Sequence, residues 1–149
     1  MVTMVGTEAS LPELVRSLQL LEHDAIAAYE QTISRLENEG YRQQIAAFKA
    51  DHDRHLEGLR SLAASLRADT PAEGDMKQLL TTGKVALASI MGDAATLRAM
   101  KTNEDDTVTA YERASRHEAA TPDARRLFET ALQDELRHRA WMETTATET

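Results

Sequence analysis

The chain has 149 residues, enough for one domain with a hydrophobic core of its own. Its 42% hydrophobic content excludes a disordered chain, and six glycines with three prolines are too few for a turn-rich β-sandwich. The lack of cysteine excludes disulfides, thiolate zinc sites and Fe–S clusters, while a net charge of -8 argues against a nucleic-acid partner.

The N-terminus lacks the basic start and the apolar stretch of a signal peptide, since the first basic residue is Arg16. The longest apolar stretch without a charge, residues 85–92, is much shorter than the roughly 20 residues that a membrane-spanning helix needs. We therefore expect a cytoplasmic protein with no membrane partner.

Four long helices are predicted, and the first two are separated by a glycine. Ser10 and Glu13 have the spacing of a capping box, so the first helix is expected over about 11–39. Gly40 is expected to end this helix in the left-handed conformation. The second helix is predicted over about 41–69, before a segment that contains proline and glycine.

The second half of the chain is predicted to form a similar pair of helices, over about 93–119 and 122–146. Thr121 is expected to cap the last helix, with Pro122 at its first position. The connection over 70–92 contains three glycines and is expected to hold a short helix. Two short turns and one long crossover are typical of a single-domain, all-α four-helix bundle built from two antiparallel hairpins.

A weak internal repeat supports two similar hairpins. The string EHDAIAAYE, which begins at Glu22, resembles EDDTVTAYE, which begins at Glu104, 82 residues later. Ionisable residues of the second and fourth helices are also related at a spacing of 83, namely Asp51, His52 and His55 with Asp134, Glu135 and His138.

Ionisable residues interrupt the hydrophobic stripes of all four helices. The six are Glu22, His52, His55, Glu104, Glu135 and His138. A helix rises about 1.5 Å per residue, so the number of residues between each position and its turn gives its height along the bundle. The heights of these positions agree within roughly 8 Å. Because an uncompensated buried charge costs several kcal/mol, divalent metal ions are expected to balance the carboxylates. A salt-bridged core without metal, or a rotated register that leaves these groups at the surface, stays an alternative.

A glutamate followed seven residues later by a tyrosine in the first and third helices, with Glu-x-x-His in the fourth, resembles the ferritin-like superfamily. Within it, rubrerythrin and small bacterial ferritin-like proteins of unknown function are the most similar, over about residues 10–145. The strings LLEHDAIAAYE and TNEDDTVTAYERA carry the resemblance best. It implies a ferritin-like four-helix bundle with a dinuclear iron site whose ligands here would be Glu22, His55, Glu104, Glu135 and His138.

His52 departs from the family pattern, because it stands where the family has a bridging glutamate. Three carboxylates are then present instead of the four that balance two Fe²⁺ ions. Asp51 points about 100° away from His52 on the helix and is assigned to the groups that surround the ligands. A dinuclear iron centre is expected, with Zn or Mn as other candidates, since imidazole suits several metals.

Tyr29 and Tyr111 are expected to pack in the core and to donate hydrogen bonds to ligand carboxylates. A redox-active phenol is the alternative interpretation. His23 and His117 fall outside the stripes and are expected to be solvated. No catalytic residue is predicted beyond the metal ligands.

The resemblance implies oxidation of Fe²⁺ by O₂ or peroxide, in iron handling or defence against oxidative stress. Without cysteine the chain has no rubredoxin-like module, so a separate electron-transfer protein is an expected partner. A homodimer is also expected, through apolar positions within 76–91. The alternatives are a metal-free or mono-metal bundle that acts as a structural or dimerisation module, and a haem protein that uses two of the histidines.

Overall fold

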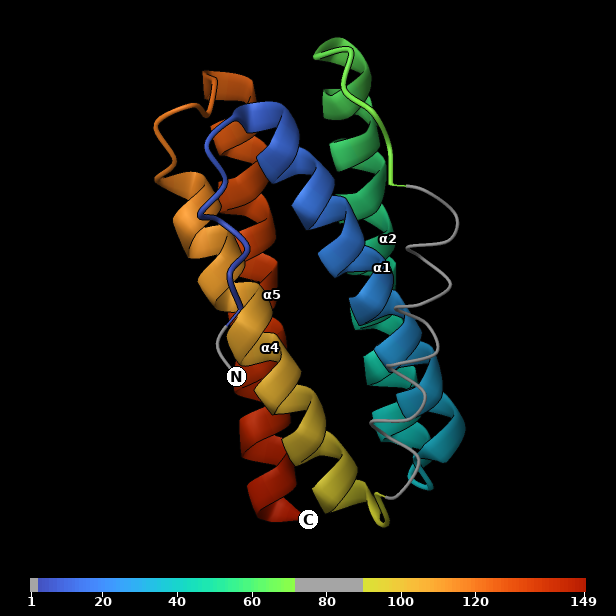
Figure 1. The fold of residues 1–149 in the computed structure, drawn as a ribbon. Coiled ribbons are helices and arrows are strands. Elements are labelled where there is room, and N and C mark those ends of the chain that lie inside the picture. Colours follow the sequence, from blue (N-terminus) through green and yellow to red (C-terminus); the bar gives the residue numbers. More distant parts are fainter. Residues whose placement is uncertain (1–2, 72–89) are drawn as a thin grey trace.

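The computed structural model describes residues 3–71 and 90–149, which form four α-helices and no β-strand. The helices are α1 (Leu11–Arg35), α2 (Glu39–Ser65), α4 (Asp93–Ser115) and α5 (Pro122–Glu148). α1 packs against α2 and α4 against α5, and the two pairs meet through α1 with α4 and α2 with α5 (Figure 1). The prediction of an all-helical four-helix bundle is confirmed. The short helix predicted within 70–92 falls almost wholly on residues 72–89, outside the described part.

Two helices begin at the caps that the sequence predicts. The Ser10 hydroxyl accepts a hydrogen bond from the Glu13 N–H at 3.3 Å, and the Thr121 hydroxyl accepts one from the Ala124 N–H at 3.2 Å. Each cap satisfies a backbone donor that has no partner inside the helix, which is worth about 1 kcal/mol.

The turn between α1 and α2 differs from the prediction. α1 ends at Arg35 because Leu36 has an extended backbone, and Gly40 lies inside the first turn of α2. The cap of α2 is Asn38, whose side-chain oxygen accepts a hydrogen bond from the Tyr41 N–H at 3.1 Å. A helix that continued to residue 39 would lose this cap.

A contact with the other hairpin holds the same turn in place. The Asp93 carboxylate accepts hydrogen bonds from the backbone N–H groups of Glu37 at 2.8 Å and Asn38 at 2.9 Å. This contact spans more than fifty residues of sequence, so no local signal could predict where α1 ends.

The remaining helix ends differ from their predicted positions by two to four residues. α2 ends at Ser65 rather than 69, where Arg67 adopts the left-handed conformation (φ 54°) and the Ala68 N–H donates to the Ala63 carbonyl. This is a common way to close a helix C-terminus. α4 ends at Ser115 rather than 119, and α5 continues to Glu148 rather than 146.

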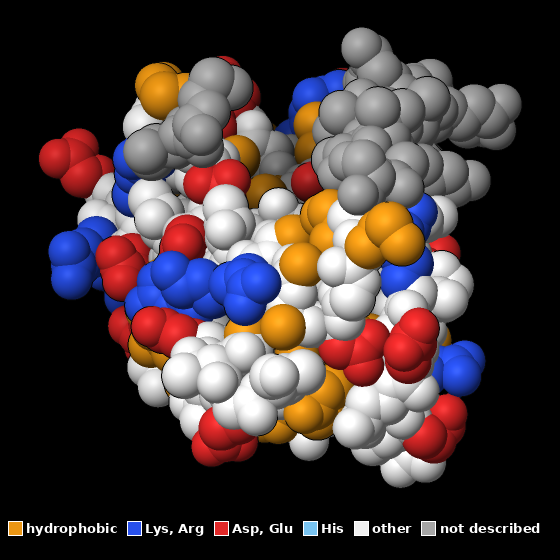
Figure 2. Space-filling view, turned by 90° about the horizontal axis from the view of Figure 1, so that it is seen from below, with side chains coloured by type: hydrophobic (Ala, Val, Ile, Leu, Met, Phe, Trp, Pro, Cys, Tyr) orange, Lys and Arg blue, Asp and Glu red, His pale blue; other side chains and the backbone are white. Residues whose placement is uncertain are grey.

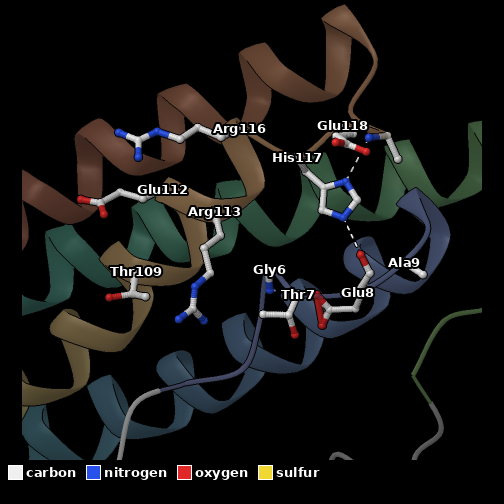
Figure 3. Close-up of a pocket in the computed structure, with 11 residues that line it drawn as sticks. Gly6, Thr7, Glu8, Ala9, Thr109, Glu112, Arg113, Arg116, His117 and Glu118 are labelled. Atoms are coloured by element: carbon white, nitrogen blue, oxygen red, sulfur yellow. Dashed lines mark hydrogen bonds between the residues drawn. The ribbon is translucent and has the colours of Figure 1, made fainter.

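His117 lies just after α4 and, like His23 on α1, is partly buried, so the prediction that both are solvated was wrong. The Nδ1 of His117 accepts a hydrogen bond from the Ala119 N–H at 3.0 Å, so Nε2 carries the proton and donates to the Glu8 carbonyl at 2.5 Å. Figure 3 shows this ring between the N-terminal segment and the turn after α4, beside a groove of about 820 Å³. Arg113 holds the same segment by donating to the carbonyls of Thr3 and Val5.

The core consists of two hydrophobic clusters at different heights of the bundle. One includes Leu14, Leu18, Leu59 and Phe128, and the other includes Ile45, Phe48, Leu97, Met100 and Met142. On every helix the predicted ionisable positions lie between the residues of these two clusters. The polar layer is therefore closed on both sides by apolar side chains that keep water out.

The surface at the end where the C-terminus lies mixes acidic, basic and hydrophobic side chains (Figure 2). No helix among the described residues combines the length and the apolar character needed to cross a bilayer. Of the apolar positions predicted to form a dimer contact, only Ile90 is described, together with the neighbouring Met91. Ile90 is half-buried beside the Phe48 cluster, and Met91 is exposed. The other positions lie outside the described residues.

Candidate metal centre

The six predicted ligand residues come together in one buried layer, although they lie on four helices. None of them exposes more than 3% of its surface, and they are Glu22 on α1, His52 and His55 on α2, Glu104 on α4, and Glu135 and His138 on α5. The i, i+3 spacing of each pair on α2 and α5 places both side chains on one helix face. Such buried groups of Glu and His could bind a metal ion.

Their donor atoms form two overlapping groups, in each of which the atoms lie within 4.8 Å of one another. The first consists of Glu22, His52, His55 and Glu135, and the second of His52, Glu104, Glu135 and His138. His52 and Glu135 belong to both groups. Two metal ions that share two of their ligand residues would require two ligand groups that overlap in this way.

The shared residues point different atoms toward the two groups. His52 Nδ1 lies 2.7 Å from Glu22 Oε2, whereas its Nε2 lies 3.7 Å from Glu104 Oε1. Glu135 Oε1 lies 3.4 Å from His55 Nδ1, and its Oε2 lies 3.7 Å from His138 Nδ1. Each shared side chain therefore offers one donor atom to each group.

Each of the two tyrosines connects its own hairpin to a glutamate of the other hairpin. Tyr29 of α1 donates its hydroxyl hydrogen to Glu104 of α4, and Tyr111 of α4 donates to Glu22 of α1 at 2.6 Å. Burial and the nearby carboxylates hold the pKa of both phenols well above the usual 10. The tyrosines therefore stay protonated, and their predicted contacts with the glutamates are confirmed.

Carboxylates on the outer side of the layer orient two of the histidines. His138 Nε2 lies 2.8 Å from Asp51 Oδ2, and His55 Nε2 lies 2.8 Å from Asp134 Oδ2. The Nδ1 atoms of both rings consequently face the centre. Asp51 was predicted in this position, whereas Asp134 was missed, although the repeat pairs it with Asp51. A metal-binding histidine usually has such a partner for its second nitrogen.

Replacing both outer carboxylates, as Asp51→Asn with Asp134→Asn, is expected to lower metal affinity by roughly 10- to 100-fold. The imidazoles would lose the acceptors that fix their orientation and raise their basicity. Competition with a coloured chelator measures the affinity. Asp53→Asn, exposed on the same helix as Asp51, serves as the control and should leave it unchanged. Equal affinity in the double variant and the wild type would contradict a role for these carboxylates.

Thr107 belongs to the centre and was not predicted. Its hydroxyl lies 2.9 Å from Glu104 Oε2 and 3.0 Å from Glu135 Oε2. The repeat places Ala25 at the corresponding position of α1, so only one side of the centre carries this hydroxyl. A threonine in a helix carries no signal of its own, and only a comparison of the two repeats could have singled it out.

In the metal-free protein, protons balance the charges of the layer. Burial and the neighbouring Glu135 raise the pKa of Glu104 to about 8, so this group stays protonated at neutral pH. Burial lowers the pKa of His55, but the adjacent carboxylates of Glu135 and Glu22 outweigh this effect and raise the pKa to about 10. His52 shifts in the same direction, mainly through the charges of Glu135 and Glu22 against the effect of burial. A metal ion would have to replace these protons.

Two atoms of the layer have no hydrogen-bond partner among the described residues. They are His52 Nε2 and Glu135 Oε1, both completely buried and both on residues shared by the two groups. Buried polar atoms are nearly always hydrogen-bonded, so each of these needs an explanation. A metal ion in each group would satisfy both. The oxygen and imidazole donors suit Fe, Mn or Zn.

The same packing argues against the haem alternative. The ring of His52 lies with its centroid 5.5 Å from that of His55 and 5.2 Å from that of His138. Tyr29 and Phe48 fill the adjoining space, with centroids 4.7 Å from His52 and 4.2 Å from His138. A porphyrin does not fit between side chains packed this closely.

Comparisons of the chain with protein-family models, with curated proteins and with solved structures found no match. The resemblance to the ferritin-like superfamily therefore stays a prediction from sequence motifs. The function has to be argued from the geometry and chemistry of the centre.

Proposed function

We propose that this chain is a ferritin-like protein that binds two divalent metal ions in its core and oxidises Fe²⁺ with O₂ or peroxide. The observation that supports it most is the pair of overlapping four-residue groups, which share His52 and Glu135. Each of these two residues also has a buried atom without a hydrogen bond among the described residues, which supports the proposal further.

In this proposal each group would hold one ion. Glu22 and His55 would bind the first and Glu104 and His138 the second, with the Glu135 carboxylate and the His52 imidazole available to either. Bound iron would supply one-electron redox chemistry toward oxygen. In the overall reaction, O₂ takes up two electrons from two Fe²⁺ ions and two protons to give H₂O₂.

The surrounding residues would hold the ligands in position and keep water away. Tyr29 and Tyr111 orient the glutamates from the opposite hairpin, and Asp51 and Asp134 keep the histidine Nδ1 atoms directed inward. The apolar clusters on both sides make the layer a medium of low polarity, where charges interact more strongly than in water. A separate electron-transfer protein would return electrons for further turnover.

A mono-metal or metal-free structural module is the second candidate. It is favoured by the proton-balanced layer, in which two imidazolium rings face Glu22 and Glu135 while Glu104 is neutral. With His52 in place of a carboxylate, three carboxylates face two divalent ions, which leaves one positive charge uncompensated.

Metal titration distinguishes these candidates. Protein stripped with a chelator is expected to bind two Fe²⁺ per chain without oxygen, and an oxygen pulse should then consume one O₂ for every two Fe²⁺. Dialysis with metal analysis and an oxygen electrode measure both ratios. One ion per chain, or zinc alone, would favour the mono-metal centre. If the protein binds none of these metals, the metal-free structural module would be the remaining candidate.

A further inference from the structure

A small notch lies on the face where α1 meets α4, at the height of the metal centre. Its volume is about 40 Å³, and it is lined by Leu21, Asp24 and Ala25 from α1 and by Asn103, Asp106 and Thr107 from α4. The notch is therefore acidic, and none of these lining residues is Lys or Arg.

One residue both lines the notch and contacts the candidate ligands. Thr107 lines the notch, is only 4% exposed, and bonds through its hydroxyl to Glu104 and Glu135. Rotation of the Thr107 side chain would release both carboxylates toward an incoming ion.

The charges at the notch favour a cation. Asp24 of α1 is half-buried and lines the notch together with Asp106 of α4. Asp106 accepts a hydrogen bond from the Thr3 N–H at 3.3 Å. Two carboxylates in a concave, partly buried surface concentrate the electric field and raise the local concentration of cations.

The opposite face, between α2 and α5, has the contrary character. Asp51 and Asp134 lie there, but Arg137 donates to Asp51 at 2.8 Å and to Asp134 at 3.1 Å. Arg54 donates to Asp51 as well. These guanidinium groups compensate the carboxylates and repel an approaching metal ion.

We propose that divalent cations reach the centre through the notch between α1 and α4, attracted by Asp24 and Asp106 and admitted past Thr107. The inference rests on the proposed function, because it concerns how the same centre is loaded. The centre is fully buried, so an ion cannot bind without a path through the packed helices.

The test is the rate of Co²⁺ uptake by the metal-free full chain, followed by visible absorption in a stopped-flow instrument. In the double variant Asp24→Asn, Asp106→Asn, uptake at low ionic strength should be about tenfold slower than in the wild type. The amount bound at saturation should not change. In 0.5 M NaCl, where the Debye length is only a few ångströms, the difference should largely disappear.

Asp53→Asn with Asp69→Asn is the matched control, because it removes the same charge from exposed positions away from the notch. It should take up Co²⁺ at the wild-type rate. Thr107→Ser keeps the hydroxyl but removes a methyl group from the barrier, so its uptake should be faster than that of the wild type.

A wild-type rate in the notch variant, or equal slowing in the control pair, would overturn the proposed path while leaving the metal centre itself intact. Failure of the wild type to bind Co²⁺ at saturation would instead contradict the proposed function. The two failures are therefore distinguishable in one set of experiments.

Discussion

Replacing Glu135 by glutamine is expected to abolish the binding of both metal ions and to lower the free energy of unfolding of the metal-free protein by about 3 kcal/mol. Glu135 belongs to both ligand groups, so its loss affects the two ions together. In the metal-free state its carboxylate faces His52, His55 and His138, and removing one partner of a buried ion pair leaves the others uncompensated. Urea unfolding in the presence of a chelator measures the stability, and Co²⁺ titration measures the binding.

Glu129→Gln, at an exposed position of α5, is the matched control for Glu135→Gln. Its stability and its metal binding should equal those of the wild type. A Glu135→Gln variant that still binds two ions would contradict the assignment of Glu135 as the shared carboxylate. If Glu135→Gln is less stable than the wild type and neither protein binds metal, the result would support the structural module.

The stability of the metal-free protein is expected to fall as pH rises from about 5 to 10, by a few kcal/mol in total. Glu104 has a pKa of about 8 in the folded protein against 4.5 ordinarily, so between these values the folded state keeps a proton that the unfolded state releases. His55 behaves likewise between 6.5 and about 10. In both ranges the folded state binds more protons, so the free energy of unfolding decreases with rising pH.

Metal binding should show the opposite trend, because the ligands must lose protons before they bind an ion. The difference in melting temperature between loaded and metal-free protein should therefore widen from pH 6 to pH 9. Thermal unfolding at several pH values, with metal or with chelator, measures it. In Glu104→Gln, which mimics the protonated acid, the metal-free protein should lose the part of the pH dependence between 4.5 and 8. A stability of the metal-free wild type that rises over this range would contradict the proton-balanced layer.

Much of the candidate centre could be predicted from spacing alone. Helical periodicity places Glu22, His52, His55 and their counterparts on the core face of each helix, and the rise per residue puts them at one height. Hairpins with short turns cannot shift their helices far along each other. The sequence pattern was therefore sufficient to predict that six residues from four helices lie together, with Tyr29 and Tyr111 beside them.

The remainder depends on contacts between the two hairpins. Asp134 reaches His55 across the α2–α5 contact, and Thr107 reaches Glu135 across the α4–α5 contact. Neither residue differs in its own helix from an ordinary polar side chain. Whether it touches a ligand depends on how far each helix is rotated, which spacing alone does not determine.

The all-helical fold, two of the helix caps and the positions of the buried ionisable residues can be predicted from the sequence, because they follow from periodicity and local hydrogen bonding. The end of α1 depends on tertiary contacts, because Asp93 of the other hairpin holds the turn that follows it. The packing of the four helices likewise sets which ligand group each nitrogen of His52 faces. Such features arise from the packing of segments far apart in the chain, where a small rotation of one helix changes which atoms meet.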